Sequence, residues 1–274
     1  MNLFTIKEVT TNYVQAGVGK TKLSISKMIL LGILAGLIIA MSSTVSSTSA
    51  HAIVNVGVLR LVTGLVFAFG LGMVVLSGAE LFTGNCLLLI PLLDRKISVG
   101  GMVKNWVVVY ISNFAGALLV AAGCALFGQL NYSDNGLAVY TIKLAIAKCT
   151  IPFSSAIVFG FFCNFLVCLG IFLANSAHDT IGKVIGAFMP VAYFVTNGFE
   201  HSIANMYYGP AGLFANTVTR YHDAAVTAGL NLGALSWGNF LTGNLLPVTL
   251  GNILGGFAFA FIMWFCNLRG TATK

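Results

Sequence analysis

Two short segments of the chain place glutamate, asparagine, threonine and histidine within otherwise apolar sequence. Residues 78–85 read GAELFTGN and residues 198–205 read GFEHSIAN. Glu80 and Glu200 are the only acidic residues deep inside apolar sequence. An ionisable group at such a depth costs at least about 2.5 kcal/mol to insert and therefore usually has a function or a partner within the protein. Two roles are open for each glutamate: contact with a transported species, or a hold on backbone amides that a helix break leaves free.

His201 directly follows Glu200 and is the one histidine within a predicted span. Burial in a membrane favours the neutral imidazole, which retains one N–H donor and one acceptor nitrogen. Such a group can donate a hydrogen bond to an anion or exchange a proton with it; the alternative is a histidine satisfied within the core. Thr83 lies three residues after Glu80, and its hydroxyl either faces His201 or bonds to its own helix backbone.

Lys148 precedes Pro152, and proline is a residue suited to the start of a helix. This order predicts that Lys148 lies at the mouth of the following span. A cation in that position attracts anions into a vestibule. The alternative is a lysine that extends along apolar surface to reach water.

The composition excludes an ordinary globular enzyme. The chain has 274 residues, of which 58% are hydrophobic and 8% charged, against roughly 25% charged in average soluble domains. The charges are not gathered into a patch for nucleic acid, and no P-loop, HExxH, catalytic triad or metal-ligand spacing occurs. The six cysteines form no CxxC pair and are interpreted as small core residues. We therefore expect an integral membrane protein that is not an enzyme and needs no metal or cofactor.

The apolar pattern predicts six membrane spans. A span needs about 20 apolar residues, and the segments are 28–48, 54–90, 102–128, 154–175, 184–208 and 245–267. The chain thus divides into an N-terminal tail (1–27), one transmembrane domain (28–267) and a C-terminal tail (268–274). Residues 50–52 (AHA) imitate a signal-peptidase site, but the preceding polar tail is long for a signal peptide. Residues 226–242 predict a re-entrant or interfacial cap, with a seventh span as the alternative.

Basic residues predict the orientation of these spans in the cytoplasmic membrane. With six spans, Arg60, Lys143, Lys148 and Arg220 fall on one side. The other side holds the remaining ten Lys and Arg residues, namely Lys7, Lys20, Lys22, Lys27, Arg95, Lys96, Lys104, Lys183, Arg269 and Lys274. Both termini are therefore expected in the cytoplasm.

The two halves of the chain resemble each other in order. The two segments quoted above share Gly, Glu and Asn at equal spacing, and Asn113-Phe-Ala-Gly116 corresponds to Asn252-Ile-Leu-Gly255. Three spans per half give a 3+3 inverted repeat, which places the transported species where corresponding helices break. The second and fifth spans are the ones we expect to break, because both contain glycine together with polar residues that can satisfy freed backbone groups.

Residues 78–85, 198–206 and 244–256 (NLLPVTLGNILGG) resemble the signatures of the formate/nitrite transporter family, over about Lys20 to Asn267. Within the family, the hydrosulfide channel branch is the most similar. The resemblance implies an aquaporin-like all-α protomer, a homopentamer in a lipid bilayer, and passage of small monovalent anions such as formate, nitrite or hydrosulfide through one pore per protomer.

The resemblance also implies roles for individual residues. The pore histidine falls on His201, the facing threonine on Thr83, the vestibule lysine on Lys148, the intramembrane glutamate on Glu200 and a pore-side asparagine on Asn164. The two hydrophobic constrictions fall on Phe67, Leu71, Phe82 and Phe194.

A bare anion in such an apolar slit faces a large desolvation cost. In one mechanism, Thr83 and His201 replace the lost hydrogen bonds to water. In the other, which we favour as a hypothesis, a weak-acid anion gains a proton near His201 and crosses as the neutral acid. A channel, a proton-coupled secondary carrier and a membrane-embedded enzyme are the competing classes. A channel is expected to show fast passive flux, a carrier to concentrate its substrate under a pH gradient, and an enzyme to consume its substrate.

Overall fold

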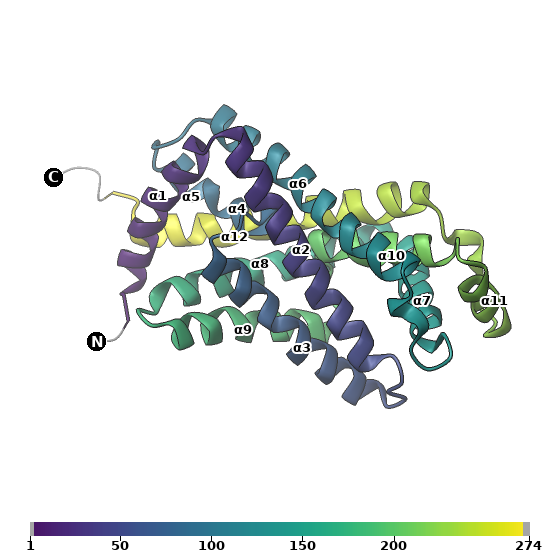
Figure 1. Ribbon diagram of the computed structural model, residues 1–274. Helices are drawn as coiled ribbons and strands as arrows, with labels where there is room; N and C mark the ends of the chain where they lie inside the picture. The colour runs from purple at the N-terminus through teal and green to yellow at the C-terminus, as the bar shows by residue number, and fades with distance from the viewer. Residues whose placement is uncertain (1–2, 271–274) are drawn as a thin grey trace.

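The computed structural model describes residues 3–270, and almost all of them lie in helices (Figure 1). The single β-bridge among these residues joins Leu3 to Ala177. The helices are α1 (Ile6–Lys22), α2 (Ile25–Ala50), α3 (Val56–Ser77), α4 (Phe82–Asn85), α5 (Leu89–Leu93), α6 (Val99–Leu126), α7 (Gly136–Thr150), α8 (Phe153–Ser176), α9 (Thr180–Asn197), α10 (Ser202–Ala215), α11 (Thr219–Thr227) and α12 (Leu246–Asn267).

Five helical segments are long and apolar enough to cross a membrane. Three of them, α2, α6 and α8, correspond closely to predicted spans, and α3 corresponds to the first part of the predicted span 54–90. The fifth is the continuous segment Asn239–Asn267. The predicted span 184–208 is not among them and is interrupted, since helix α9 ends at Asn197 and α10 begins at Ser202. The predicted span 54–90 is divided in the same way between Ser77 and Phe82.

Glycine ends the helix at both interruptions. Gly78 follows α3 with φ +68°, and Gly198 follows α9 with φ +73°. This left-handed conformation is readily accessible only to glycine and is the usual way to close the last turn of a helix. The two interruptions thus have the same local cause.

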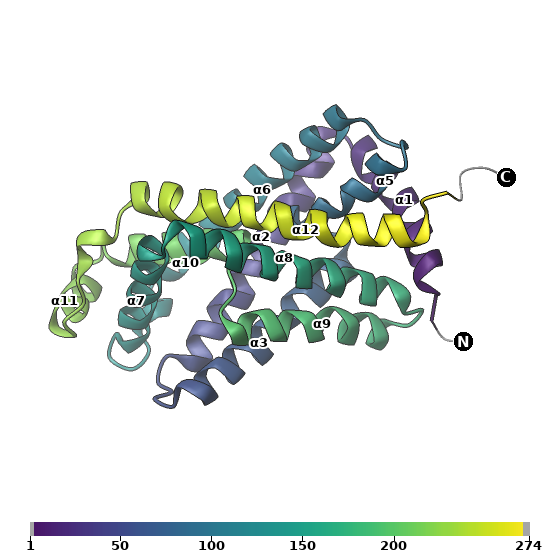
Figure 2. The same ribbon diagram turned by 180° about the vertical axis from the view of Figure 1, so that it is seen from behind.

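Pairs of helices pack closely through glycine in both halves. A Cβ atom on Gly36 of α2 would overlap the carbonyl of Asn113 in α6, and one on Gly255 of α12 would overlap the carbonyl of Phe161 in α8. Small residues allow such close approach between membrane helices. Figure 2 shows α12 and α8 running side by side, with α9 on the other face of α8.

Three regions differ from the sequence predictions. Residues 1–27 were expected as a polar tail, but Thr5 and Glu8 form a capping box that starts α1. One face of α1 buries Val9, Tyr13 and Val14 against the bundle. Helix α7 was not predicted at all.

The last spanning helix begins earlier than the predicted position near Pro247. Residues Asn239–Leu245 form a π-helix that runs directly into α12. Phe240 and Leu245 are buried and extend the apolar face of α12 across this turn. Within residues 3–270, the predicted cap region 226–242 forms no separate spanning helix.

The fold has two distinct ends. Helix α1 and the carboxyl end of α12 contact each other at one end, and α7 and α11 lie at the opposite end (Figures 1 and 2). The two helix interruptions lie between these ends, so they can position polar groups inside the bundle.

Candidate functional site: two buried turns and the cavities beside them

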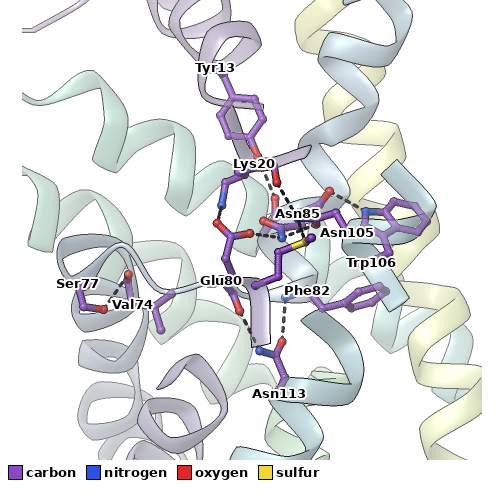
Figure 3. Close-up of polar contacts among 12 residues, drawn as sticks. Tyr13, Lys20, Val74, Ser77, Glu80, Phe82, Asn85, Asn105, Trp106 and Asn113 are labelled. Atoms are coloured by element: carbon purple, nitrogen blue, oxygen red, sulfur yellow. Dashed lines mark hydrogen bonds and ion pairs between the residues drawn. The ribbon is translucent and has the colours of Figure 1, made fainter. Parts of the chain in front are cut away.

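The first turn, residues 78–81, joins α3 to α4 and is braced by an asparagine side chain. Asn113 Oδ1 accepts the backbone N–H of Phe82 at 2.9 Å, while its Nδ2 donates to the carbonyl of Glu80 at 2.8 Å (Figure 3). The same Nδ2 donates to the carbonyl of Gly32, also at 2.8 Å. These bonds satisfy backbone groups that the end of α3 leaves without helical partners. A break inside a membrane is tolerated only where such partners exist.

The second turn, residues 198–201, joins α9 to α10 and repeats this arrangement. Asn252 Oδ1 accepts the backbone N–H of Ser202 at 2.9 Å. Its Nδ2 donates to the carbonyl of Gly160 at 2.8 Å and to that of Glu200 at 2.9 Å. The repeat predicted that Asn113 and Asn252 occupy corresponding positions, and the two side chains make equivalent hydrogen bonds.

Glu80 lies at the centre of a polar network in the first half. Its Oε1 is 2.6 Å from Lys20 Nζ, and its Oε2 accepts a 2.7 Å bond from Asn85 Nδ2. The same Nδ2 also donates to Asn105 Oδ1 at 2.8 Å. Figure 3 shows these side chains converging from α1, the first turn and α6.

Glu200 has the matching network in the second half. Its Oε1 is 2.6 Å from Lys148 Nζ, and its Oε2 accepts a 2.6 Å bond from Asn205 Nδ2. Asn205 Nδ2 then donates to Asn244 Oδ1 at 2.8 Å. Asn244 lies in the π-helix, whose altered register directs it toward this network; π-turns are frequent at functional sites.

Both ion pairs are largely withdrawn from solvent. The glutamate side chains are 4% and 7% exposed, and the lysine side chains are 25% and 18% exposed, for the Lys20 and Lys148 pairs respectively. A buried carboxylate needs both a counter-charge and hydrogen bonds to its remaining lone pairs. Each glutamate has both, so each turn carries a neutral, internally satisfied network.

His201 and Thr83 bring the two turns together. His201 Nε2 lies 3.0 Å from Thr83 Oγ1, and both residues are buried. His201 Nδ1 accepts the backbone N–H of Ala204 at 3.1 Å, which makes the imidazole the N-terminal cap of α10. Since an acceptor nitrogen carries no hydrogen, the ring proton of the neutral imidazole is on Nε2, and Nε2–H donates to Thr83.

The aromatic residues predicted as constrictions lie around this contact. The Phe67 and Phe194 rings meet edge-on with centroids 6.2 Å apart, and Phe194 stacks on His201 at 5.8 Å. Leu71 is buried one turn after Phe67 on α3. Phe82 packs edge-on against Tyr110 at 4.8 Å.

Two separate cavities lie on either side of the His201–Thr83 contact. The first, called cavity 1, has a volume of about 400 Å³ and is lined by Phe67, Phe194, Lys148, Glu200 and His201 among others. The second, cavity 2, has a volume of about 190 Å³ and is lined by Tyr13, Lys20, Leu71, Leu81, Gly84 and Asn85 among others. Thr83 is 0% exposed and lines neither cavity, so the two cavities are separate at this residue.

Three of the predicted site residues line neither cavity, and they are Thr83, Phe82 and Asn164. Asn164 is buried and donates to the backbone carbonyl of Asn252 at 2.7 Å. In this structure it thus contacts the residue that braces the second turn.

Sequence analysis missed Lys20, Asn105 and Asn244 as members of the networks. Lys20 lies in a segment with the composition of a tail, and no local pattern relates it to Glu80. The other two are single asparagines outside the quoted repeat matches. The sequence offered no signal for these pairings, because Glu200 was also predicted without its lysine partner.

Apolar helices braced around two internal turns, with a buried polar contact between two cavities, are typical of a membrane protein. Residues 7–266 match the family model "Formate/nitrite transporter". The chain is 37% identical over 269 residues to a probable formate transporter of Methanothermobacter thermautotrophicus, covering 91% of this chain and 92% of the relative.

Two further comparisons agree. The formate channel FocA of Escherichia coli (strain K12) is 34% identical, with 88% of this chain and 86% of the relative covered. A solved pentameric formate channel with formate bound superposes with a TM-score of 0.78 at 34% identity, covering 88% of this chain and 96% of that one. The chain belongs to the formate/nitrite transporter family, whose members are channels and transporters and not enzymes.

Proposed function

We propose that each protomer passes small monovalent anions across the cytoplasmic membrane, through a route that joins cavity 1 to cavity 2 at His201 and Thr83. The observation that supports this most directly is the buried contact between these two hydrogen-bonding side chains, with a cavity on each side. Phe67 and Phe194 form the apolar constriction next to cavity 1, and Leu71 and Phe82 the one next to cavity 2. Lys148 lines cavity 1 and, with Glu200 and Asn164, completes the proposed site.

In the proposed topology the chain crosses the membrane six times as a 3+3 inverted repeat. Segments α3–α5 and α9–α10 are the interrupted crossings. The matching networks of Glu80 and Glu200 support this arrangement. Helix α1 and the end of α12 lie at the same end of the molecule (Figure 1), which fits two cytoplasmic termini.

Formate is the first substrate to test, because the two curated relatives and the solved structure described above carry that anion in their names. Nitrite and hydrosulfide are monovalent conjugate bases of small acids as well. The motifs at 78–85, 198–206 and 244–256 resemble those of the hydrosulfide branch, so hydrosulfide belongs in the same assay. The pentameric assembly of the solved formate channel is the basis for proposing a homopentamer here.

The hydrogen bonds of His201 define its part in the mechanism. An anion that enters between Thr83 and His201 accepts a bond from Nε2–H in place of the threonine oxygen. A second proton on the ring would have to sit on Nδ1, which is occupied by the Ala204 N–H. His201 therefore acts as a hydrogen-bond donor, and a weak-acid anion that crosses as its neutral acid takes its proton from hydronium of the solvent and leaves water.

A flux assay in liposomes tests the proposal. Stopped-flow uptake of formate, nitrite, hydrosulfide and chloride is measured with and without an imposed pH gradient. We expect fast uptake of the weak-acid anions and much slower uptake of chloride. Equal fluxes for chloride and formate would contradict protonation-assisted passage. Accumulation of formate beyond the distribution that its neutral acid reaches across the imposed pH gradient would identify the alternative, a proton-coupled secondary carrier.

A further inference from the structure

Cavity 1 carries more positive charge than its ion pair balances. Its lining includes three cations, Arg60, Lys143 and Lys148, and one carboxylate, Glu200. The 2.6 Å pair between Lys148 and Glu200 neutralises one of each. Neither Arg60 nor Lys143 takes part in an ion pair within residues 3–270. Two uncompensated cations therefore line the wall of this cavity.

Arg60 is held at the second helix interruption. A methyl group placed on Gly198 would lie 3.0 Å from Arg60 Nη1 and 3.4 Å from Arg60 Cζ, so the guanidinium packs directly on this glycine. Gly198 closes the carboxyl end of α9, which carries a partial negative charge of about half a unit. That partial charge orients Arg60 beside the turn that bears Glu200 and His201, and leaves most of its positive charge for another partner.

The opposite side has no equivalent. Among residues 3–270, Lys20 is the only charged residue that lines cavity 2, and it is paired with Glu80. When the two turns are aligned on Gly78 and Gly198, the position of Arg60 corresponds to Thr180. Each half therefore has a lysine paired with its glutamate, whereas the cation at Arg60 has no counterpart in the other half. Lys143, which lies on α7 between the two halves, is also outside the repeat.

We propose that Arg60 and Lys143 form an anion-capture site in cavity 1, which concentrates formate and other small monovalent anions before they reach His201. This inference rests on the proposed function of anion passage. A cleft lined by one sign of charge raises the local concentration of an oppositely charged solute and its rate of capture by about 10-fold or more. Lys148 contributes little to this field, because Glu200 cancels its charge.

Anionic lipid headgroups share the chemistry that would bind to these side chains. The experiment therefore measures formate uptake by stopped flow in liposomes of neutral phosphatidylcholine, and again with phosphatidylglycerol added. The variants are Arg60→Gln, Lys143→Gln, the double variant and Arg60→Lys. Arg220→Gln is the matched control, since Arg220 is predicted on the same side and lines neither cavity.

At low formate concentration, each single Gln variant is expected to reduce uptake about threefold, and the double variant about 10-fold. The maximal rate at saturating formate stays unchanged. Arg60→Lys and Arg220→Gln behave like the wild type. The difference disappears in about 1 M of an impermeant salt, since the Debye length there is roughly 3 Å.

Three outcomes overturn the inference in distinguishable ways. Uptake by the wild type no faster than through protein-free liposomes removes the proposed function itself. Normal wild-type uptake together with an unchanged concentration dependence in the double variant shows that no capture site exists. A difference that appears only with phosphatidylglycerol assigns Arg60 and Lys143 to a lipid headgroup. Thermal unfolding and size-exclusion profiles of each variant check that the assembly is intact, and Lys143→Gln alone retains the test if the Arg60 variants are unstable.

Discussion

The imidazole of His201 accepts the backbone N–H of Ala204 through Nδ1, at 3.1 Å, and contacts Thr83 through Nε2, at 3.0 Å. One side chain thus caps helix α10 and supplies the donor at the closed point between the cavities. A substitution can separate the two roles. The helix cap needs an acceptor close to the backbone, whereas the contact with Thr83 needs a donor farther along the side chain.

Replacing His201 by phenylalanine removes both roles. We expect anion uptake to be lost and the protein to be destabilised by about 1 kcal/mol, the usual cost of losing an N-terminal cap. Replacing it by asparagine keeps a good capping acceptor and shortens the donor. This variant is expected to retain near wild-type thermal stability and still to lose uptake. Wild-type uptake in both variants would refute a pore-lining role.

The hydroxyl of Thr83 is the second polar group at the contact. Thr83→Val keeps the shape of the side chain but leaves His201 Nε2–H without its buried acceptor, at a cost of about 1–3 kcal/mol. Thr83→Ser retains the hydroxyl. We expect stopped-flow uptake of formate to fall at least tenfold in the valine variant and to remain within about threefold in the serine variant. An equal loss in both variants would point to a packing role for the methyl group.

The Lys148–Glu200 pair provides a stability test. Lys148→Met leaves a buried carboxylate without its counter-charge, and breaking a buried pair in this way typically costs about 3 kcal/mol. Adding Glu200→Gln removes that carboxylate and is expected to restore much of the loss. A double-mutant cycle on thermal unfolding measures the coupling. Additive effects would show that the pair contributes no specific energy. The same cycle at Lys20 and Glu80 tests the network of the first half.

Close contact between α2 and α6 can be tested with two glycines of the same helix. A Cβ on Gly116 would overlap the carbonyl of Ile33, whereas nothing lies within 4 Å of a Cβ on Gly123. Gly116→Ala is expected to destabilise the protein by about 1–3 kcal/mol through overpacking. Gly123→Ala should stabilise it by about 0.5–1 kcal/mol, because alanine loses less backbone entropy in a helix. Equal shifts in melting temperature would argue against tight packing at Gly116.

Local sequence patterns predicted the two turns well. Matching Gly, Glu and Asn residues identified the interruptions, and Asn113 and Asn252 brace them with the same bonds. These features depend on a few residues near each turn and on the ability of glycine to adopt a positive φ angle. The contact between His201 and Thr83 was one of two alternatives that the residues left open, and the family resemblance favoured it.

Long-range pairing was beyond the reach of these patterns. Lys20 contacts Glu80 only because α1 folds back against the bundle, and its surrounding composition is that of a tail. Asn244 reaches the Glu200 network through a π-turn, which hydropathy does not reveal. Lys148 was predicted at a mouth without a counter-ion, since the pairing of residues 52 positions apart is decided by tertiary packing.

The order of the ion-pair partners along the chain bears on how the protein is made. Lys20 precedes Glu80 by 60 residues, and Lys148 precedes Glu200 by 52. During synthesis, the cation of each pair leaves the ribosome before its acid. Each carboxylate thus arrives when a neutralising partner is already available, which lowers the barrier to moving it from the translation machinery into the lipid phase.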